Sequence, residues 1–323
     1  MSLYTSILSV ILATNSTVVA ISNEVQSATG VSLPVVDPKD PAEIELRQVM
    51  MDDDTAMDDV QKMIQENDKF TAQGAGRSKE DLNRLIHARL DVVTKEYNDF
   101  LVKYPRSARG YDAYGTFLND IGKEDEAAVQ YEKSKNIDPN NPAVWNNLAN
   151  YYGEFSPVTN AFAYYAKAIE LDPTEPTYYQ NFATTVYLFR HDATNFYNIN
   201  EPQVFDMALG LYRKAMQLKP NDLPLAADYA ESYYGIKPLR TNDALVAWTN
   251  ALAIAKDDNE REGVYIHLAR IKITVGRYAE AQAQLDAITN SAYADMRKRL
   301  QRNLNDKLHP AATTNSPASA IVD

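Results

Sequence analysis

The sequence contains no cysteine, and its 323 residues include only four histidines and two tryptophans. The lack of cysteine excludes disulfides, thiolate metal ligands, cysteine nucleophiles and lipid anchors attached through cysteine. Basic residues are also in deficit, because 32 Lys and Arg stand against 44 Asp and Glu, which gives a formal net charge of −12. Since this average field repels polyanions, we expect no nucleic-acid partner.

Catalytic motifs are missing from the sequence as well. No pair of histidines has the i, i+4 spacing of a zinc-protease helix; the four are His87, His191, His267 and His309. Gly115 and Gly122 have six residues between them where a phosphate loop has four, and Glu124 replaces the Ser or Thr of that loop. We therefore predict that the protein is not an enzyme and has no cofactor, no metal and no evident small-molecule substrate.

Charge is nearly absent from the first 36 residues, where Glu24 is the only charged side chain. The apolar stretch Ile7–Ile21 is interrupted by polar residues and is too short for a stable membrane span. Small residues before position 21 suit a secretory signal over residues 1–20, but no Lys or Arg precedes the apolar stretch. Two interpretations of residues 1–41 stay open: a signal peptide plus linker, which predicts a periplasmic or secreted protein, or an N-terminal extension of a cytoplasmic one.

Residues 42–107 are predicted to form N-terminal helices that include a degenerate half-repeat. Apolar residues recur at helical spacing from 42 to 70, and we place Asp52–Asp54 at the start of a second helix, where the helix dipole favours acids. A calcium loop is excluded there because Met57 stands where its glycine is required. At the other end, the composition of residues 310–323 predicts a disordered tail.

A period of 34 residues runs through the middle of the chain. Seven pairs of residues keep this separation: Tyr111 and Trp145, Tyr114 and Leu148, Gly115 and Ala149, Leu118 and Tyr152, Ala127 and Ala161, Tyr131 and Tyr165, and Pro139 and Pro173. A fixed period of this length is typical of solenoids, in which no single repeat can bury its apolar face alone.

The pattern resembles the tetratricopeptide repeat, which places aromatic residues, a large–small pair, an alanine and a proline at these offsets. Five copies are assigned to residues 108–141, 142–175, 176–222, 223–258 and 262–292, with 293–309 as a capping helix. The resemblance is to bacterial tetratricopeptide proteins of unassigned activity. It implies an all-α, right-handed α-solenoid of about five helix hairpins, with an N-terminal helical extension and a C-terminal capping helix.

Small residues recur at one position in each helix of the predicted hairpins. In the first, or A, helices they are Gly115, Ala149, Ala183, Ala230 and Ala269, and in the second, or B, helices they are Ala127, Ala161, Ala208, Ala244 and Ala281. Because small side chains let two helices approach closely, we expect these positions to be buried where the A and B helices meet.

The resemblance further implies that the A helices line a concave groove in which partners lie. The A-helix positions that the core does not need are polar and rich in amides, and the candidate groove residues are Asp112, Asn146, Asn147, Asn150, Gln180, Asn181 and Asp228. Asn and Gln can donate to and accept from a peptide backbone whatever its sequence. A solvated helix face without a ligand is the alternative.

The third copy is longer than the others. Pro220 follows Pro173 by 47 residues, so this copy carries 13 extra residues, which we place at 191–203. Long insertions in compact repeats are often functional, and we take Phe196 and Tyr197 as candidate contact residues. The alternative is that this loop packs its own aromatic side chains.

These observations predict an interaction scaffold or adaptor that binds another protein, through a peptide segment or helix in the concave groove. A structural accessory subunit of a bacterial envelope assembly, with no groove ligand, is the alternative.

Overall fold

The computed structural model describes residues 39–155 and 157–309, and within these ranges the chain is helical without any strand. Residues 1–38, for which a signal peptide was one interpretation, and the predicted tail at 310–323 lie outside the described residues. The chain divides after Pro173 into an N-terminal and a C-terminal unit, which are described separately.

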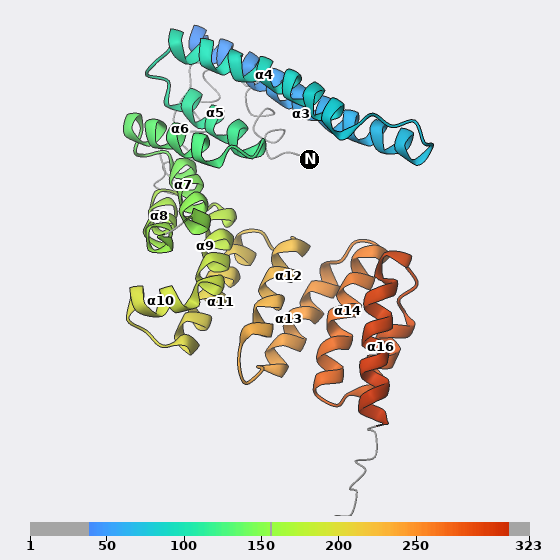
Figure 1. Cartoon of the computed structure of the whole chain (residues 1–323). Helices are drawn as coiled ribbons and strands as arrows, with labels where there is room; N and C mark the ends of the chain where they lie inside the picture. Colours follow the sequence, from blue (N-terminus) through green and yellow to red (C-terminus); the bar gives the residue numbers. More distant parts are fainter. Residues whose placement is uncertain (1–38, 156, 310–323) are drawn as a thin grey trace, which may run out of the picture. The chain divides into compact units, whose positions relative to one another are not determined.

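The N-terminal unit is built from three successive helix pairs (Figure 1). The helices are α3 (Pro41–Ala72), α4 (Lys79–Lys103), α5 (Ala108–Asp120), α6 (Glu124–Ile137), α7 (Pro142–Phe155) and α8 (Val158–Leu171). Helices α3 and α4, of 32 and 25 residues, lie side by side and are followed by the hairpins α5–α6 and α7–α8.

Helix α3 is longer than predicted, because the predicted start of a second helix lies within it. Asp52–Asp54 lie in the middle of α3, not at the start of a second helix. The helix begins at Pro41, where the Asp40 side chain accepts a hydrogen bond from the Ala42 amide, and contains no glycine and no further proline that would end it. Tertiary contacts reinforce this continuity, since the Tyr97 hydroxyl on α4 donates to Asp53 Oδ2 at 2.9 Å.

The C-terminal unit continues the pairs of helices, with two 3₁₀ turns. Its elements are α9 (Pro176–Leu188), α10 (Arg190–Tyr197), α11 (Glu201–Leu218), α12 (Leu223–Glu231), η1 (Ser232–Gly235), α13 (Thr241–Ile254), α14 (Asp258–Thr274), α15 (Tyr278–Asp286), η2 (Ser291–Tyr293) and α16 (Ala294–Leu308). Helix α9 pairs with α11, α12 with α13, and α14 with α15, while α16 packs on α14 and α15 through buried Leu300 and Leu304.

The predicted small positions are buried in every copy, which confirms their role in packing. The nine alanines are at most 1% exposed. Gly115 is buried within α5. At Gly115 the two helices approach closely, because an added Cβ would lie 2.6 Å from the Tyr131 ring of α6. The A and B helices of a hairpin therefore meet at contacts that leave no room for a larger side chain.

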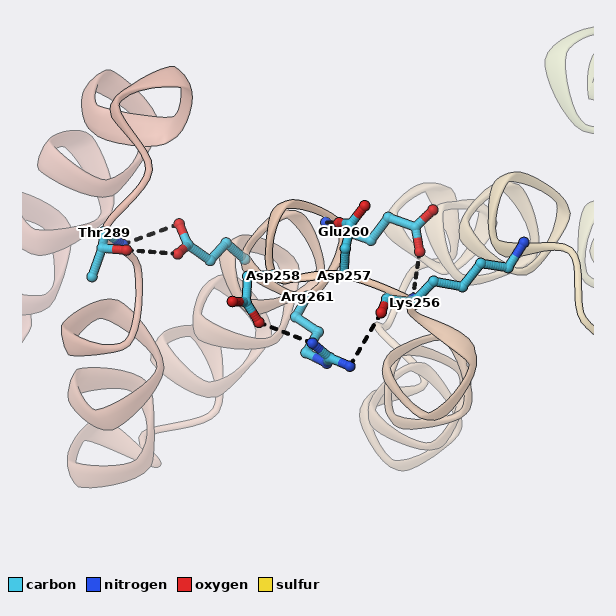
Figure 2. Close-up of polar contacts among 7 residues, drawn as sticks. Lys256, Asp257, Asp258, Glu260, Arg261 and Thr289 are labelled. Carbon is cyan, nitrogen blue, oxygen red and sulfur yellow. Dashed lines mark hydrogen bonds and ion pairs between the residues drawn. The ribbon is translucent and has the colours of Figure 1, made fainter. Parts of the chain in front are cut away.

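The fourth copy ends differently from the copies that end in proline. Lys256 stands there in place of proline, and its amide donates to Glu260 Oε2 at 2.6 Å, which a proline could not do (Figure 2). Nearby, the buried Glu262 carboxylate accepts three hydrogen bonds, from the amides of Thr289 and Asn290 and from the Thr289 hydroxyl. These bonds lower the pKa of Glu262 and tie the start of α14 to the segment that follows α15.

Candidate functional site

The candidate groove residues of the N-terminal unit lie on α5 and α7, the A helices of the first two copies. Asp112 Oδ2 accepts a hydrogen bond from Asn141 Nδ2 at 3.1 Å, which links α5 to the residue just before α7. Burial raises the pKa of Asp112 to about 6, although the amides of Asn141 and Asn147 and the charge of Arg109 favour its ionised form. The contact with Asn147 joins Asp112 to the second copy, whereas Asn141 is the last residue of the first copy.

The three asparagines of α7 have different environments. Asn146 is only 6% exposed, and its Nδ2 donates to Asn147 Oδ1 at 3.5 Å, so little of it is open to a partner. Asn150 is exposed, and its Oδ1 accepts from the Tyr165 hydroxyl at 2.7 Å. The Asn150 amide nitrogen has no partner among residues 39–155 and 157–309, which leaves two N–H donors for a ligand.

The candidate groove residues of the C-terminal unit lie on α9 and α12. Gln180 Nε2 donates to Asp228 Oδ2 at 2.7 Å, so the A helices of the third and fourth copies are joined by a side-chain bond. Asn181, which follows Gln180 in the sequence, is half-buried. Its main-chain carbonyl accepts a hydrogen bond from the Thr185 hydroxyl at 2.9 Å. The structure therefore brings Gln180 and Asp228 together although they are 48 positions apart in the sequence.

A contact within the hairpins of the first three copies was not predicted. The B-helix tyrosine of the first three copies reaches the A-helix residue that follows the small position: Tyr131 to Thr116 at 3.5 Å, Tyr165 to Asn150 at 2.7 Å and Tyr212 to Thr184 at 2.8 Å. The sequence contained a signal for this contact, since both positions follow the 34-residue period and are 15 positions apart in the first two copies. These tyrosines hold the orientation of the polar residue on the A-helix face.

Comparison with known proteins supports the repeat. The tetratricopeptide repeat family model matches residues 142–175, the second copy. Comparison with curated proteins gave no match. Among solved structures, PilW, described as a widely conserved type IV pilus biogenesis factor, has a TM-score of 0.51 and 14% identity over 75% of this chain and 98% of PilW.

A second solved structure, the C-terminal part of a repeat-containing protein from Cytophaga hutchinsonii, has a TM-score of 0.50 and 17% identity over 78% of this chain and 98% of that one. Identities this low show a shared fold alone. The chain contains a tetratricopeptide repeat at residues 142–175, and its helix hairpins share the fold of these solved structures.

The fifth copy of the repeat also has polar side chains at the A-helix positions of the candidate groove residues. Because Ala269 follows Ala230 by 39 residues, His267 corresponds to Asp228 and Arg270 to Glu231. The His267 ring stacks on Trp248 at 4.0 Å between centroids, and its Nδ1 lies 3.2 Å from the Tyr234 hydroxyl. Burial lowers the pKa of His267 to about 4, with a further contribution from Arg270, so the imidazole is neutral near pH 7.

The insertion in the third copy is largely helical. Residues Arg190–Tyr197 form α10, which ends at Asn198 with a left-handed φ of 52°. A capping box of Asn200 and Gln203 then starts α11. Phe196 is 46% exposed and lies edge-on to Tyr197, with 4.8 Å between the ring centroids, while burial raises the pKa of Tyr197 to about 12.

A metal site or a membrane-spanning helix would be an alternative to the A-helix face. Across residues 39–155 and 157–309, no group of three or more His, Asp or Glu side chains is placed to hold a metal ion. In the same ranges, no helix combines the length and the apolar character needed to cross a bilayer. Within these ranges, the A-helix face is therefore the best-supported candidate site, because its polar side chains contact one another.

Proposed function

We propose that this protein is a non-catalytic adaptor whose A-helix faces bind an extended segment of a partner protein. The observation that carries the proposal is the bond between Gln180 and Asp228, because it shows polar positions of consecutive A helices lying next to each other. In the N-terminal unit, the hydrogen bond between the Asn147 amide and Asp112 supports the same arrangement, because it joins α7 to α5. Each unit then presents a polar strip that crosses successive helices.

The chemistry of these strips suits a polypeptide backbone. An extended segment offers carbonyl and N–H groups at regular intervals, and the N–H donors of Asn150 can bind a carbonyl without reading the side chain beside it. Tyr165 holds the Asn150 carboxamide by its oxygen, so the amide nitrogen is oriented before a ligand arrives. Such preorganisation lowers the entropy cost of binding.

The test is selection of peptides from a random 12-residue display library on the full chain, followed by calorimetry with the selected peptides. We expect Asn147→Ala with Asn150→Ala to weaken binding about tenfold, since each lost hydrogen bond contributes roughly 0.5–1.5 kcal/mol. Asn146 is excluded from the variant because its burial would make the result a test of stability.

The matched control is Asn136→Ala with Asn160→Ala, which removes two exposed asparagines from the B helices α6 and α8. Binding should be unchanged in this control, and both variants should keep the wild-type circular dichroism. Selected peptides that bind the groove variant and the wild type equally would contradict the proposal and favour a structural spacer without a groove ligand.

We also propose Phe196 as a contact residue at the α10 insertion, because its apolar ring is 46% exposed and is positioned by Tyr197. Phe196→Ala is expected to weaken the same peptides or a captured partner severalfold while the melting temperature changes little. Tyr197→Ala is a different test, since partial burial of Tyr197 makes a loss of stability the expected result. A large drop in melting temperature for Phe196→Ala would show that this ring is structural.

A further inference from the structure

A cavity of about 320 Å³ lies in the C-terminal unit between the B helices α11 and α13. Its polar lining includes Arg213, Tyr229, Tyr233, Arg240 and Asp243. None of the candidate groove residues lines it, so it is a surface separate from the polar strips. Its volume falls in the range of sites that take small ligands or single side chains.

The cavity arises where the fourth copy departs from the repeat. Alignment on the small positions puts Tyr229 where the third copy has Phe182, and Tyr233 where it has Val186. Helix α12 also ends at Glu231, so Tyr233 lies in the 3₁₀ turn that follows. Two phenol hydroxyls therefore occupy a layer that the third copy fills with apolar side chains.

These hydroxyls retain one unused donor. Tyr229 and Tyr233 are hydrogen-bonded to each other at 2.9 Å, which uses one of their two hydroxyl hydrogens. The other hydrogen has no acceptor in the part of the chain that the structure describes. Burial and the neighbouring Tyr229 hydroxyl raise the pKa of Tyr233, so the Tyr233 hydroxyl keeps its proton near pH 7.

The charged side chains of the lining differ in whether they are already paired. Arg240 donates to Asp206 at 2.5 Å, whereas Arg213 forms no ion pair or side-chain hydrogen bond within the described ranges. Asp243 is the only acid among the lining residues, and Asp206 already pairs with Arg240, so Arg213 is the guanidinium left to bind an anion. The apolar part of the lining includes Val246, which is 60% exposed.

We propose that this cavity binds a monocarboxylate with an apolar body, with the carboxylate on Arg213 and the unused tyrosine hydroxyl and the apolar body against Val246. A guanidinium matches a carboxylate in shape and charge, and the bond is stronger than one between neutral groups. Asp243 opposes a second negative charge, which favours a monoanion over a phosphate dianion. The ligand is either a free organic acid or the C-terminal residue of a polypeptide, since both present this chemistry.

The test is calorimetry on the full chain, with the methyl signals of Val246 followed by NMR. The probes are N-acetyl-L-phenylalanine, its carboxamide, and a pentapeptide of four alanines and a C-terminal phenylalanine. We expect the acid and the peptide to bind and to shift the Val246 signals, and the uncharged carboxamide to bind at least tenfold more weakly. A peptide that binds more tightly than the acid would identify a polypeptide C-terminus as the ligand, and the reverse order a free acid.

Three variants make the proposal falsifiable. Arg213→Gln should weaken the acid roughly tenfold, Asp243→Asn should strengthen it severalfold, and Arg299→Gln, which changes an exposed arginine outside the cavity, should have no effect. The gain expected for Asp243→Asn cannot come from misfolding. Equal binding of acid and carboxamide, or folded Arg213 and Asp243 variants with wild-type affinity, would overturn the proposal. Groove variants should leave this binding intact, so its failure and that of the proposed adaptor function are distinguishable.

Discussion

Replacing Trp248 with alanine is expected to lower the free energy of unfolding of the C-terminal unit by about 3–5 kcal/mol. Trp248 is only 1% exposed and is among the largest fully buried side chains of the described residues. Its ring is stacked on His267 at 4.0 Å and lies 6.5 Å from the Tyr234 ring, so its removal leaves a cavity between α13, η1 and α14. Alanine at this position also removes the contact that holds the neutral His267 in place.

The two tryptophans allow this prediction to be measured unit by unit. Trp145 lies in the N-terminal unit and Trp248 in the C-terminal unit, so the fluorescence of Trp248→Ala reports the N-terminal unit alone. Because repeats contact only their neighbours, we expect far-UV circular dichroism to show an early loss of helix at urea concentrations where Trp145 fluorescence is unchanged.

The matched control is Trp145→Ala. Trp145 is half-buried, and its Nε1 donates to the Pro139 carbonyl at 2.8 Å. This substitution should cost less than Trp248→Ala, and its effect should appear in the N-terminal unit. A loss below about 1 kcal/mol for Trp248→Ala would mean that the neighbouring side chains collapse into the space, contrary to the expectation for a close-packed core.

The helix hairpins could be predicted from the sequence because the packing of each hairpin requires certain residue types at fixed positions of the repeat. The positions of Gly115 and Ala149 allow only small side chains, and the aromatic and proline positions lie at fixed offsets from them. Such a pattern depends on contacts within a hairpin and with its neighbour, and it survives the substitution of most other residues.

Other parts depend on contacts that no local pattern specifies. Asp52–Asp54 suggested a helix start, but contacts of α3 with α4, including the bond from Tyr97, keep the helix continuous. The helix α10 in the insertion has no counterpart in the repeat from which it could be inferred.

The candidate site was predicted only in part, for the same physical reason. The periodic positions of Gln180 and Asp228 indicated a shared face, and the structure joins them directly. The burial of Asn146 depends on how the neighbouring helices pack around it, which the spacing of polar residues does not report. The cavity beside Tyr233 also escaped prediction, because it follows from the early end of α12.

The second large effect is expected at Asp53, in the contact between α3 and α4. Burial raises the pKa of Asp53 from 3.8 to about 7, with smaller increases from Asp54 and Asp120, although the hydrogen bond from Tyr97 acts in the opposite direction. The folded protein therefore binds this proton more tightly than the unfolded chain does. Protonation of Asp53 therefore stabilises the fold. This effect is complete below the pKa that Asp53 has in the unfolded chain, and it is lost as the pH rises from about 4 to about 7.

Asp53→Asn should consequently raise the free energy of unfolding at pH 8 by on the order of 1–3 kcal/mol, a range reduced from the full shift because the carboxyl is partly solvated. The asparagine carbonyl can still accept the hydrogen bond from Tyr97, so the substitution removes the buried charge and keeps the contact. At pH 4, where the wild-type carboxyl is already largely protonated in the folded state, the gain should nearly vanish.

Urea titrations at pH 4, 6 and 8 measure this difference, and Asp58→Asn, an exposed position on the same helix, is the matched control. We expect the stability of the control to follow the pH as the wild type does, while that of Asp53→Asn falls less between pH 4 and pH 8. If Asp53→Asn were instead destabilised at pH 8, the charge-assisted bond from Tyr97 would outweigh the cost of burying the carboxylate. The sign of the change thus decides which of the two opposing effects controls the docking of α3 on α4.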